Sequence, residues 1–166
     1  EVNTAEEMKL APPEGGRIEI VRVSVQMDRK WGEAINMAGP NTMINHAIWE
    51  VGDQYPAGQE NLETEIILMN FGQKGGSWEK VIAWAEEHGL KRTNPRHVFS
   101  IGEHKPQLHH ELGMNSMYVV ATEDCIFGGD RRACSVFWWY DSDRGCSLRW
   151  LEYCGGSDDW FAFLRE

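Results

Sequence analysis

The chain has 166 residues, of which 42% are hydrophobic and 11% aromatic, and its formal net charge at pH 7 is −10. A chain of this size buries roughly two-thirds of the surface that its unfolded form exposes, and this balance of apolar and charged residues is typical of a globular protein. No apolar run approaches the roughly 20 residues of a membrane-spanning helix, the first residues do not resemble a secretory signal, and the negative charge disfavours binding to phosphate backbones. We therefore expect a cytoplasmic protein that binds neither membranes nor nucleic acid.

The N-terminal part of the chain is expected to form a β-α-β-β unit after a flexible arm. The arm, residues 1–16, ends in two prolines and two glycines, which disfavour regular structure. β-Branched residues predict a strand over residues 17–27, after which Asp28 can cap a short helix that ends at Gly39. Further strands are predicted over residues 44–51 and 62–71. A single domain is expected to span residues 17–166.

Three short helices are predicted in the middle of the chain. Ser77 can accept a hydrogen bond from first-turn amides, and apolar residues then recur at helical spacing until Gly89, a residue suited to the left-handed position after a helix. Asn94 is a capping residue, and Pro95 suits the first turn of a second helix. The third helix is predicted over residues 106–112.

From residue 117 onward the pattern changes to strands separated by short turns rich in glycine and aspartate. Four strands are predicted, over residues 117–127, 131–140, 146–154 and 160–165. Because short turns join antiparallel neighbours, we predict a C-terminal four-stranded antiparallel meander. The whole chain is therefore predicted to be an α+β domain, with the N-terminal unit, the central short helices and the meander in that order.

The predicted meander carries more aromatic residues than a sheet with one solvated face requires. Apolar side chains occur on both of its faces, so one face needs a cover, which the N-terminal strands, a partner subunit or an apolar ligand could supply. The leading hypothesis is a non-enzymatic binding or accessory protein that forms a homodimer or binds a small apolar ligand or a protein partner. The residues assigned to this surface are Trp138, Trp139, Trp150, Trp160, Phe137 and Phe161.

A second hypothesis is a metal-assisted hydrolase. His97, His104 and His109 lie among carboxylates and would converge on a metal ion if two short helices fold against each other. The tight spacing of motifs such as HEXXH is absent, so histidines at the surface or in helix packing are the favoured interpretation, and we expect no cofactor. A third hypothesis is an acidic inhibitor or immunity-type protein that uses its negative charge to mask a basic partner.

The four cysteines match no metal or redox spacing and are expected to be buried thiols in a reducing compartment. One cross-strand disulfide is an alternative. A two-residue hairpin turn at residues 129–130 would place Cys125 opposite Cys134. The acidic residues next to Cys125 are expected to raise the pKa of its thiol rather than activate it.

Two turn regions could bind ions. The predicted meander would gather Asp130, Asp158 and Asp159 at one edge, where they could hold a hard cation. The glycine-rich loop over residues 72–77 leads into a helix, as anion-binding loops do, but it lacks the P-loop spacing. Since turns favour glycine and aspartate for backbone reasons alone, we interpret both regions first as structural turns.

A longer pattern resembles a known family. It consists of NFGQKGGSWEKVIAWAEEHGLKRTNPRHVFSIGEHKPQLHHELG, then MYVVAT, a strand that contains WW, and DDWFAFLRE. Over residues 62–166 the chain resembles a family of small bacterial proteins of the kind found among mobile integron gene cassettes. The resemblance implies a cytoplasmic accessory protein, and it implies no activity and no functional residues.

Overall fold

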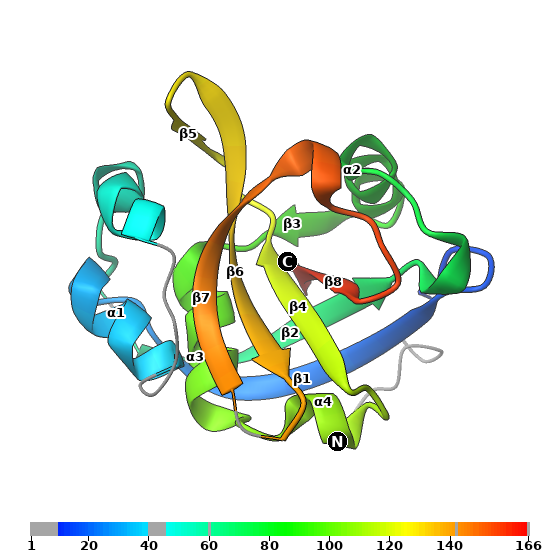
Figure 1. Cartoon of the computed structure of the whole chain (residues 1–166), viewed down its shortest axis with the longest axis horizontal. Coiled ribbons are helices and arrows are strands. Elements are labelled where there is room, and N and C mark those ends of the chain that lie inside the picture. Colours follow the sequence, from blue (N-terminus) through cyan, green and yellow to red (C-terminus); the bar gives the residue numbers. More distant parts are fainter. Residues whose placement is uncertain (1–9, 40–45, 60, 142, 166) are drawn as a thin grey trace.

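One mixed β-sheet with helices on both faces makes up the fold (Figure 1). The computed structural model describes residues 10–39, 46–59, 61–141 and 143–165. The sheet order is β1-β2-β8-β4-β6-β5, with β3 beside β8 and β7 beside β6. The predicted α+β class is therefore confirmed. The strands are β1 (Arg17–Gln26), β2 (Asn61–Asn70), β3 (Leu90–Arg92), β4 (Ser116–Ala121), β5 (Cys125–Phe127), β6 (Asp130–Trp139), β7 (Asp143–Trp150) and β8 (Asp159–Arg165).

The last strand does not continue a meander, and this part of the sequence prediction is wrong. β4, β6 and β7 are antiparallel neighbours, but β8 enters the sheet between β2 and β4. There it pairs antiparallel with β2 and parallel with β4. The segment that joins β7 to β8 contains η3 (Leu151–Tyr153), and the carbonyl of Gly155 accepts a hydrogen bond from the amide of Gly76 at 2.8 Å. This contact with the start of α2 leads the chain away from β7.

The helices form largely where their local signals predict them. Ser77 accepts a hydrogen bond from the amide of Lys80 at the start of α2, and Asn94 and His97 form a capping box at the start of α3. One signal is wrong, because α1 begins after Lys30 and not after Asp28. The helices are α1 (Trp31–Ala38), α2 (Trp78–Glu87), α3 (Pro95–His104) and α4 (Leu108–Glu111).

The strand predicted over residues 44–51 is wrong, since residues 46–54 form the 3-10 helix η1 (His46–Gln54). Residues 44 and 45 lie outside the described residues. Ile48, Val51 and Tyr55 are all buried, and their spacing of three and four residues places them on one side of a helical turn. The carbonyl of Ile48 accepts a hydrogen bond from Trp31 Nε1 at 2.7 Å, which fixes η1 against α1. The N-terminal unit is thus β-α-η-β.

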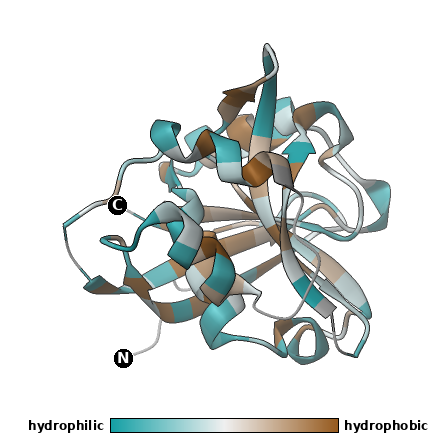
Figure 2. Cartoon of the chain, turned by 60° about the vertical axis from the view of Figure 1, so that its left-hand side comes forward, coloured by the Kyte–Doolittle hydropathy of each residue, from teal (hydrophilic) through white to brown (hydrophobic). Residues whose placement is uncertain are grey.

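Two hydrophobic clusters cover the two faces of the sheet. The larger one packs α1, α3 and η1 on one face, and the smaller one packs α2 on the other. Figure 2 shows that hydrophobic residues gather on the central strands and on parts of the helices that flank them. Residues of β8 alternate between the two clusters as predicted, with Trp160 and Ala162 in the larger and Phe161 and Phe163 in the smaller. The second apolar face therefore packs on α2 of the same chain.

The β5–β6 hairpin differs in register from the prediction. Its turn residues are Gly128 and Gly129, both at positive φ, so Cys125 pairs with Arg132 and not with Cys134. All four cysteines are free and buried. The expectation of buried thiols is confirmed.

Part of the predicted arm packs against the domain. The carbonyl of Ala11 accepts a hydrogen bond from Trp84 Nε1 at 2.9 Å, and Gly16 N donates to Pro13 O at 2.8 Å. Residues 1–9 lie outside the described residues. Within the part of the chain that is described, no helix has the length and apolar character needed to cross a bilayer.

Candidate functional site

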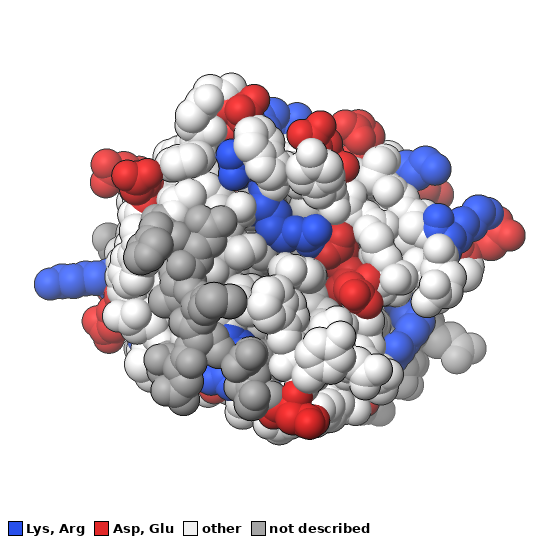
Figure 3. All heavy atoms as spheres, viewed as in Figure 1, with Lys and Arg blue, Asp and Glu red and all other residues white. Residues whose placement is uncertain are grey.

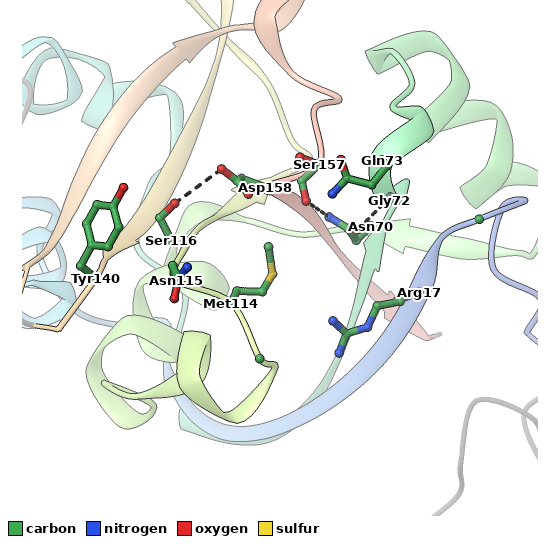
Figure 4. A pocket seen from close by; sticks show the side chains of 12 residues that line it. Arg17, Asn70, Gly72, Gln73, Met114, Asn115, Ser116, Tyr140, Ser157 and Asp158 are labelled. Atoms are coloured by element: carbon green, nitrogen blue, oxygen red, sulfur yellow. Dashed lines mark hydrogen bonds between the residues drawn. The ribbon is translucent and has the colours of Figure 1, made fainter.

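The ends of five strands lie close together at one end of the sheet. The strand registers place Arg17 at the start of β1 opposite Asn70 at the end of β2, and Asn70 opposite Trp160 near the start of β8. The start of β4 lies beside β8 and beside the end of β6 through the pairs Tyr118–Asp159 and Ser116–Trp139. These ends surround a cavity of about 520 Å³ (Figure 4). It is lined by Gly15, Arg17, Asn70, Gly72, Gln73, Gly113, Met114, Asn115, Ser116, Tyr140, Ser157 and Asp158.

Asn70 ties three walls of the cavity together. Its side-chain amide donates hydrogen bonds to the carbonyls of Ser157 and Asp159, both at 2.9 Å, and its Oδ1 accepts the amide of Gly72 at 2.8 Å. Because Asn70 is buried and its amide donors are both used, it acts as a structural support and not as a ligand contact. Gly72 has φ of +74°, and a Cβ there would lie 2.1 Å from the carbonyl oxygen of Gly15. Glycine is required where these two backbones approach.

The wall formed by Tyr140 has an unusual backbone. Tyr140 has φ of +52°, and among the described residues it is the one non-glycine residue at positive φ. Its amide donates to the carbonyl of Asn115 at 2.7 Å, and its carbonyl accepts a hydrogen bond from His109 Nε2. Backbone of this kind costs about 1–3 kcal/mol and persists where the surroundings enforce it, often at functional sites.

Several polar side chains of the lining keep free hydrogen-bonding groups. Within the described residues, the side chains of Gln73, Asn115 and Tyr140 make no hydrogen bond, and all three are exposed. Among the side chains that the structure describes, the Asp158 carboxylate has one hydrogen-bond partner, the Ser116 hydroxyl, at 3.5 Å. Figure 4 shows these side chains around the same space. The lining therefore offers donors and acceptors from separate segments of the chain to a small polar molecule.

Three of the predicted aromatic site residues belong to the two core clusters. Trp138 and Trp160 belong to the larger core cluster and Phe161 to the smaller one, and all three are completely buried. Trp138 donates from Nε1 to the carbonyl of Lys105 at 3.2 Å, and Trp160 from Nε1 to the sulfur of Met114 at 2.9 Å. Trp160 thereby supports a residue that lines the cavity.

The other three predicted aromatic residues are not members of these clusters; Phe137 is nevertheless buried, whereas Trp139 and Trp150 are half-buried. The rings of Phe137 and Trp139 contact each other, with centres 4.7 Å apart and planes tilted by 39°. Trp150 lies under the guanidinium of Arg132, whose carbon is 3.4 Å from the ring centre. The six aromatic residues do not share one surface. The expected homodimer, apolar ligand, protein partner and inhibitor role remain predictions.

The predicted metal ligands do not meet. His97 and His104 stand at the two ends of α3, about 10 Å apart along its axis. His97 Nδ1 accepts the amide of Asn94 at 3.0 Å, and burial lowers the pKa of His97. His109 contacts the Tyr140 carbonyl instead. Among the described residues no three His, Cys, Asp or Glu side chains are placed to hold a metal ion.

The predicted aspartate group is also dispersed. Asp130 lies at the start of β6, where it pairs with Phe127 of β5. Asp159 of β8 pairs with Tyr118 of β4, and Tyr118 in turn pairs with Phe137, near the end of β6. Asp130 and Phe137 are about 23 Å apart along the strand. The three aspartates do not come together as the predicted meander would require, because β8 does not lie beside β7.

Charge does not concentrate on the face that contains β7, β6 and β4. Figure 3 shows acidic and basic side chains there in small mixed groups. Arg149 and Asp159 form a partly buried ion pair.

Comparison with known proteins adds no assignment. No protein-family model matches the chain, and neither curated proteins nor solved structures include one that is significantly similar. The functional argument therefore depends on the geometry of the site.

Proposed function

We propose that the protein is a binding protein that holds a small polar molecule in the cavity at the strand ends. The observation that carries this proposal is the convergence of free polar side chains, from segments far apart in sequence, around one cavity of about 520 Å³. Clefts of about 300–1,000 Å³ with a few placed polar groups are typical of small-molecule sites.

The proposal changes the ligand expected from the sequence. The aromatic residues that favoured an apolar ligand are largely used in the two cores, where α2 covers the second face. The cavity lining contains one aromatic side chain, Tyr140, and one other large apolar side chain, Met114. A polar ligand satisfies this lining, whereas an apolar ligand would leave its donors and acceptors without partners.

A cavity-filling variant tests the proposal. Ligand-observed NMR with the full chain and a panel of water-soluble small molecules identifies bound compounds. Asn115→Trp places a large ring at an exposed position of the lining and keeps the backbone carbonyl that Tyr140 uses. Asn36→Trp makes the same change on the exposed side of α1, away from the cavity.

We expect polar compounds to bind the unmodified chain and Asn36→Trp, and to lose binding to Asn115→Trp. The proposal is wrong if no compound of the panel binds, or if Asn115→Trp keeps the binding of every compound. Circular dichroism of both variants confirms that the fold is retained.

A further inference from the structure

The two charged residues of the cavity define the chemical class of the ligand, an inference that rests on the proposed function. Of the lining residues, Arg17 and Asp158 carry a charge, and they come from β1 and from the turn before β8. Figure 4 shows them on different sides of the cavity. The lining is neutral in sum but has a positive and a negative side.

The guanidinium of Arg17 is held in place while some of its donors stay free. Its Nη1 donates to the carbonyl of Leu112 at 3.0 Å, and its Cζ lies 5.0 Å from the centre of the Trp160 ring. The carboxylate nearest to it among the described residues, that of Glu19, is 3.9 Å from Nη2, which is beyond hydrogen-bond distance. Because a guanidinium has five N–H donors in a planar fork, Arg17 can bind a carboxylate of the ligand through two of them.

Two adjacent aspartates show which carboxylate is free. Asp159 is buried, accepts the amides of Gly155 at 2.8 Å and Gly156 at 3.1 Å, and pairs with Arg149. Asp158 is exposed, and within the described residues no cation lies within ion-pair distance of it. Its backbone is nevertheless fixed, because its carbonyl accepts the amide of Tyr118 at 2.8 Å. Asp159 is structural, and Asp158 is an anchored acceptor for a cationic or hydroxyl group.

We infer that the cavity binds a short peptide with free ends, whose carboxylate contacts Arg17 and whose ammonium group contacts Asp158. A ligand with both charges gives each of the two side chains a partner of opposite charge at hydrogen-bond distance when water is displaced, whereas a ligand with one charge does so for only one of them. The side chains of Gln73, Asn115 and Tyr140 then face the peptide groups of the ligand. A zwitterion is also not repelled by the net charge of −10, as an anion would be.

Isothermal titration calorimetry with the full chain tests this inference, with trialanine as the probe. N-Acetyl-trialanine lacks the ammonium group, trialanine amide lacks the carboxylate, and maltotriose is a neutral polar molecule of similar size. We expect trialanine to bind most tightly, and loss of either charge to weaken binding about tenfold or more.

The protein variants locate each charge. Asp158→Asn is expected to weaken the binding of trialanine about tenfold and to leave the affinity for N-acetyl-trialanine unchanged. Arg17→Gln is expected to weaken the binding of trialanine and to leave the affinity for trialanine amide unchanged. Asp53→Asn removes one exposed negative charge on η1, outside the cavity, and should change no affinity.

The outcomes separate this inference from the proposed function. The peptide inference is wrong if trialanine does not bind, or binds no better than either blocked peptide. Binding of maltotriose that Asn115→Trp abolishes would then leave the proposed function intact. If Asn115→Trp retains the affinity for every probe that binds, both are wrong.

Discussion

His109 Nε2 donates a hydrogen bond to the carbonyl of Tyr140, the described non-glycine residue with positive φ. The carbonyl is only an acceptor, so Nε2 carries the proton, and Nδ1 of the same ring is buried with no partner among the described residues. The His109 ring also stacks on His110 at 3.9 Å. His109, a candidate metal ligand in the sequence, therefore fixes one wall of the candidate cavity.

The positive φ of Tyr140 predicts that glycine is more stable than tyrosine at this position. Tyr140→Gly relieves a left-handed conformation and should raise the free energy of unfolding by about 1 kcal/mol. Tyr153 is equally exposed, at 67%, but does not have positive φ. Tyr153→Gly should therefore lower stability by about 0.5–1 kcal/mol. Urea unfolding measures the stability of both variants. A loss of stability in both would contradict backbone strain at Tyr140.

The Arg149–Asp159 pair should contribute much more to stability than the Arg22–Glu65 pair. The side chains of the first pair are 17% and 4% exposed, against 39% and 19% for the second. Arg149→Met leaves a buried carboxylate without its cation and should cost about 3 kcal/mol. Arg22→Met should cost less than about 1 kcal/mol, and added salt should reduce that cost further. Equal losses of stability in guanidinium chloride unfolding would show that burial does not make one ion pair contribute more than the other.

Close backbone approach predicts a large effect at Gly72. A Cβ at this position would lie 2.1 Å from the carbonyl oxygen of Gly15, and φ is +74°. Gly89 has a similar φ of +68° with nothing within 4 Å of the added Cβ. Gly89→Ala should therefore cost about 1–2 kcal/mol, the cost of the left-handed conformation alone. Thermal unfolding should show a larger loss of stability for Gly72→Ala than for Gly89→Ala. Equal losses of stability would exclude a steric contribution at Gly72.

The thiols should differ in reactivity although all are buried. A hydrogen bond from Cys134 lowers the pKa of the Cys125 thiol, which overturns the expectation that its acidic neighbours dominate. Burial raises the pKa of Cys146 and that of Cys154 to about 12. Cys125 is 3% exposed and Cys154 is 4% exposed, so access is matched. Mass mapping after brief alkylation at mildly alkaline pH should therefore find Cys125 modified before Cys154.

Removal of the donor provides the control for this prediction. Cys134→Ala should slow the alkylation of Cys125, whereas Cys146→Ala should leave its rate unchanged. Alkylation of Cys154 ahead of Cys125 in the unmodified chain would be incompatible with the proposed hydrogen bond.

Local signals in the sequence were sufficient for most helices and strands. Ser77 and Asn94 cap α2 and α3 as predicted, because capping depends on residues within one turn. The strand predicted over residues 44–51 is wrong, because the buried residues Ile48, Val51 and Tyr55 have helical spacing and η1 forms there. α3 contains Gly102, where a Cβ would lie 2.6 Å from the carbonyl oxygen of Ala38, so this glycine permits close packing of α3 against α1.

The candidate site could not be predicted from the sequence. Arg17, Asn70 and Asp158 are far apart in the chain and meet only because β8 pairs with β2. A prediction that places β8 beside β7 separates them. Their signal in the sequence is weak, because polar residues at strand ends are common in turns.

The central position of β8 also constrains how the protein can be made. β1 and β2 form one antiparallel pair, and β4, β6 and β7 form another antiparallel group, but β8 is the strand that hydrogen-bonds to both. A ribosome synthesises all of these strands before β8. Until then the edges of β2 and β4 that pair with β8 stay open, and an open edge is a template for pairing with another chain.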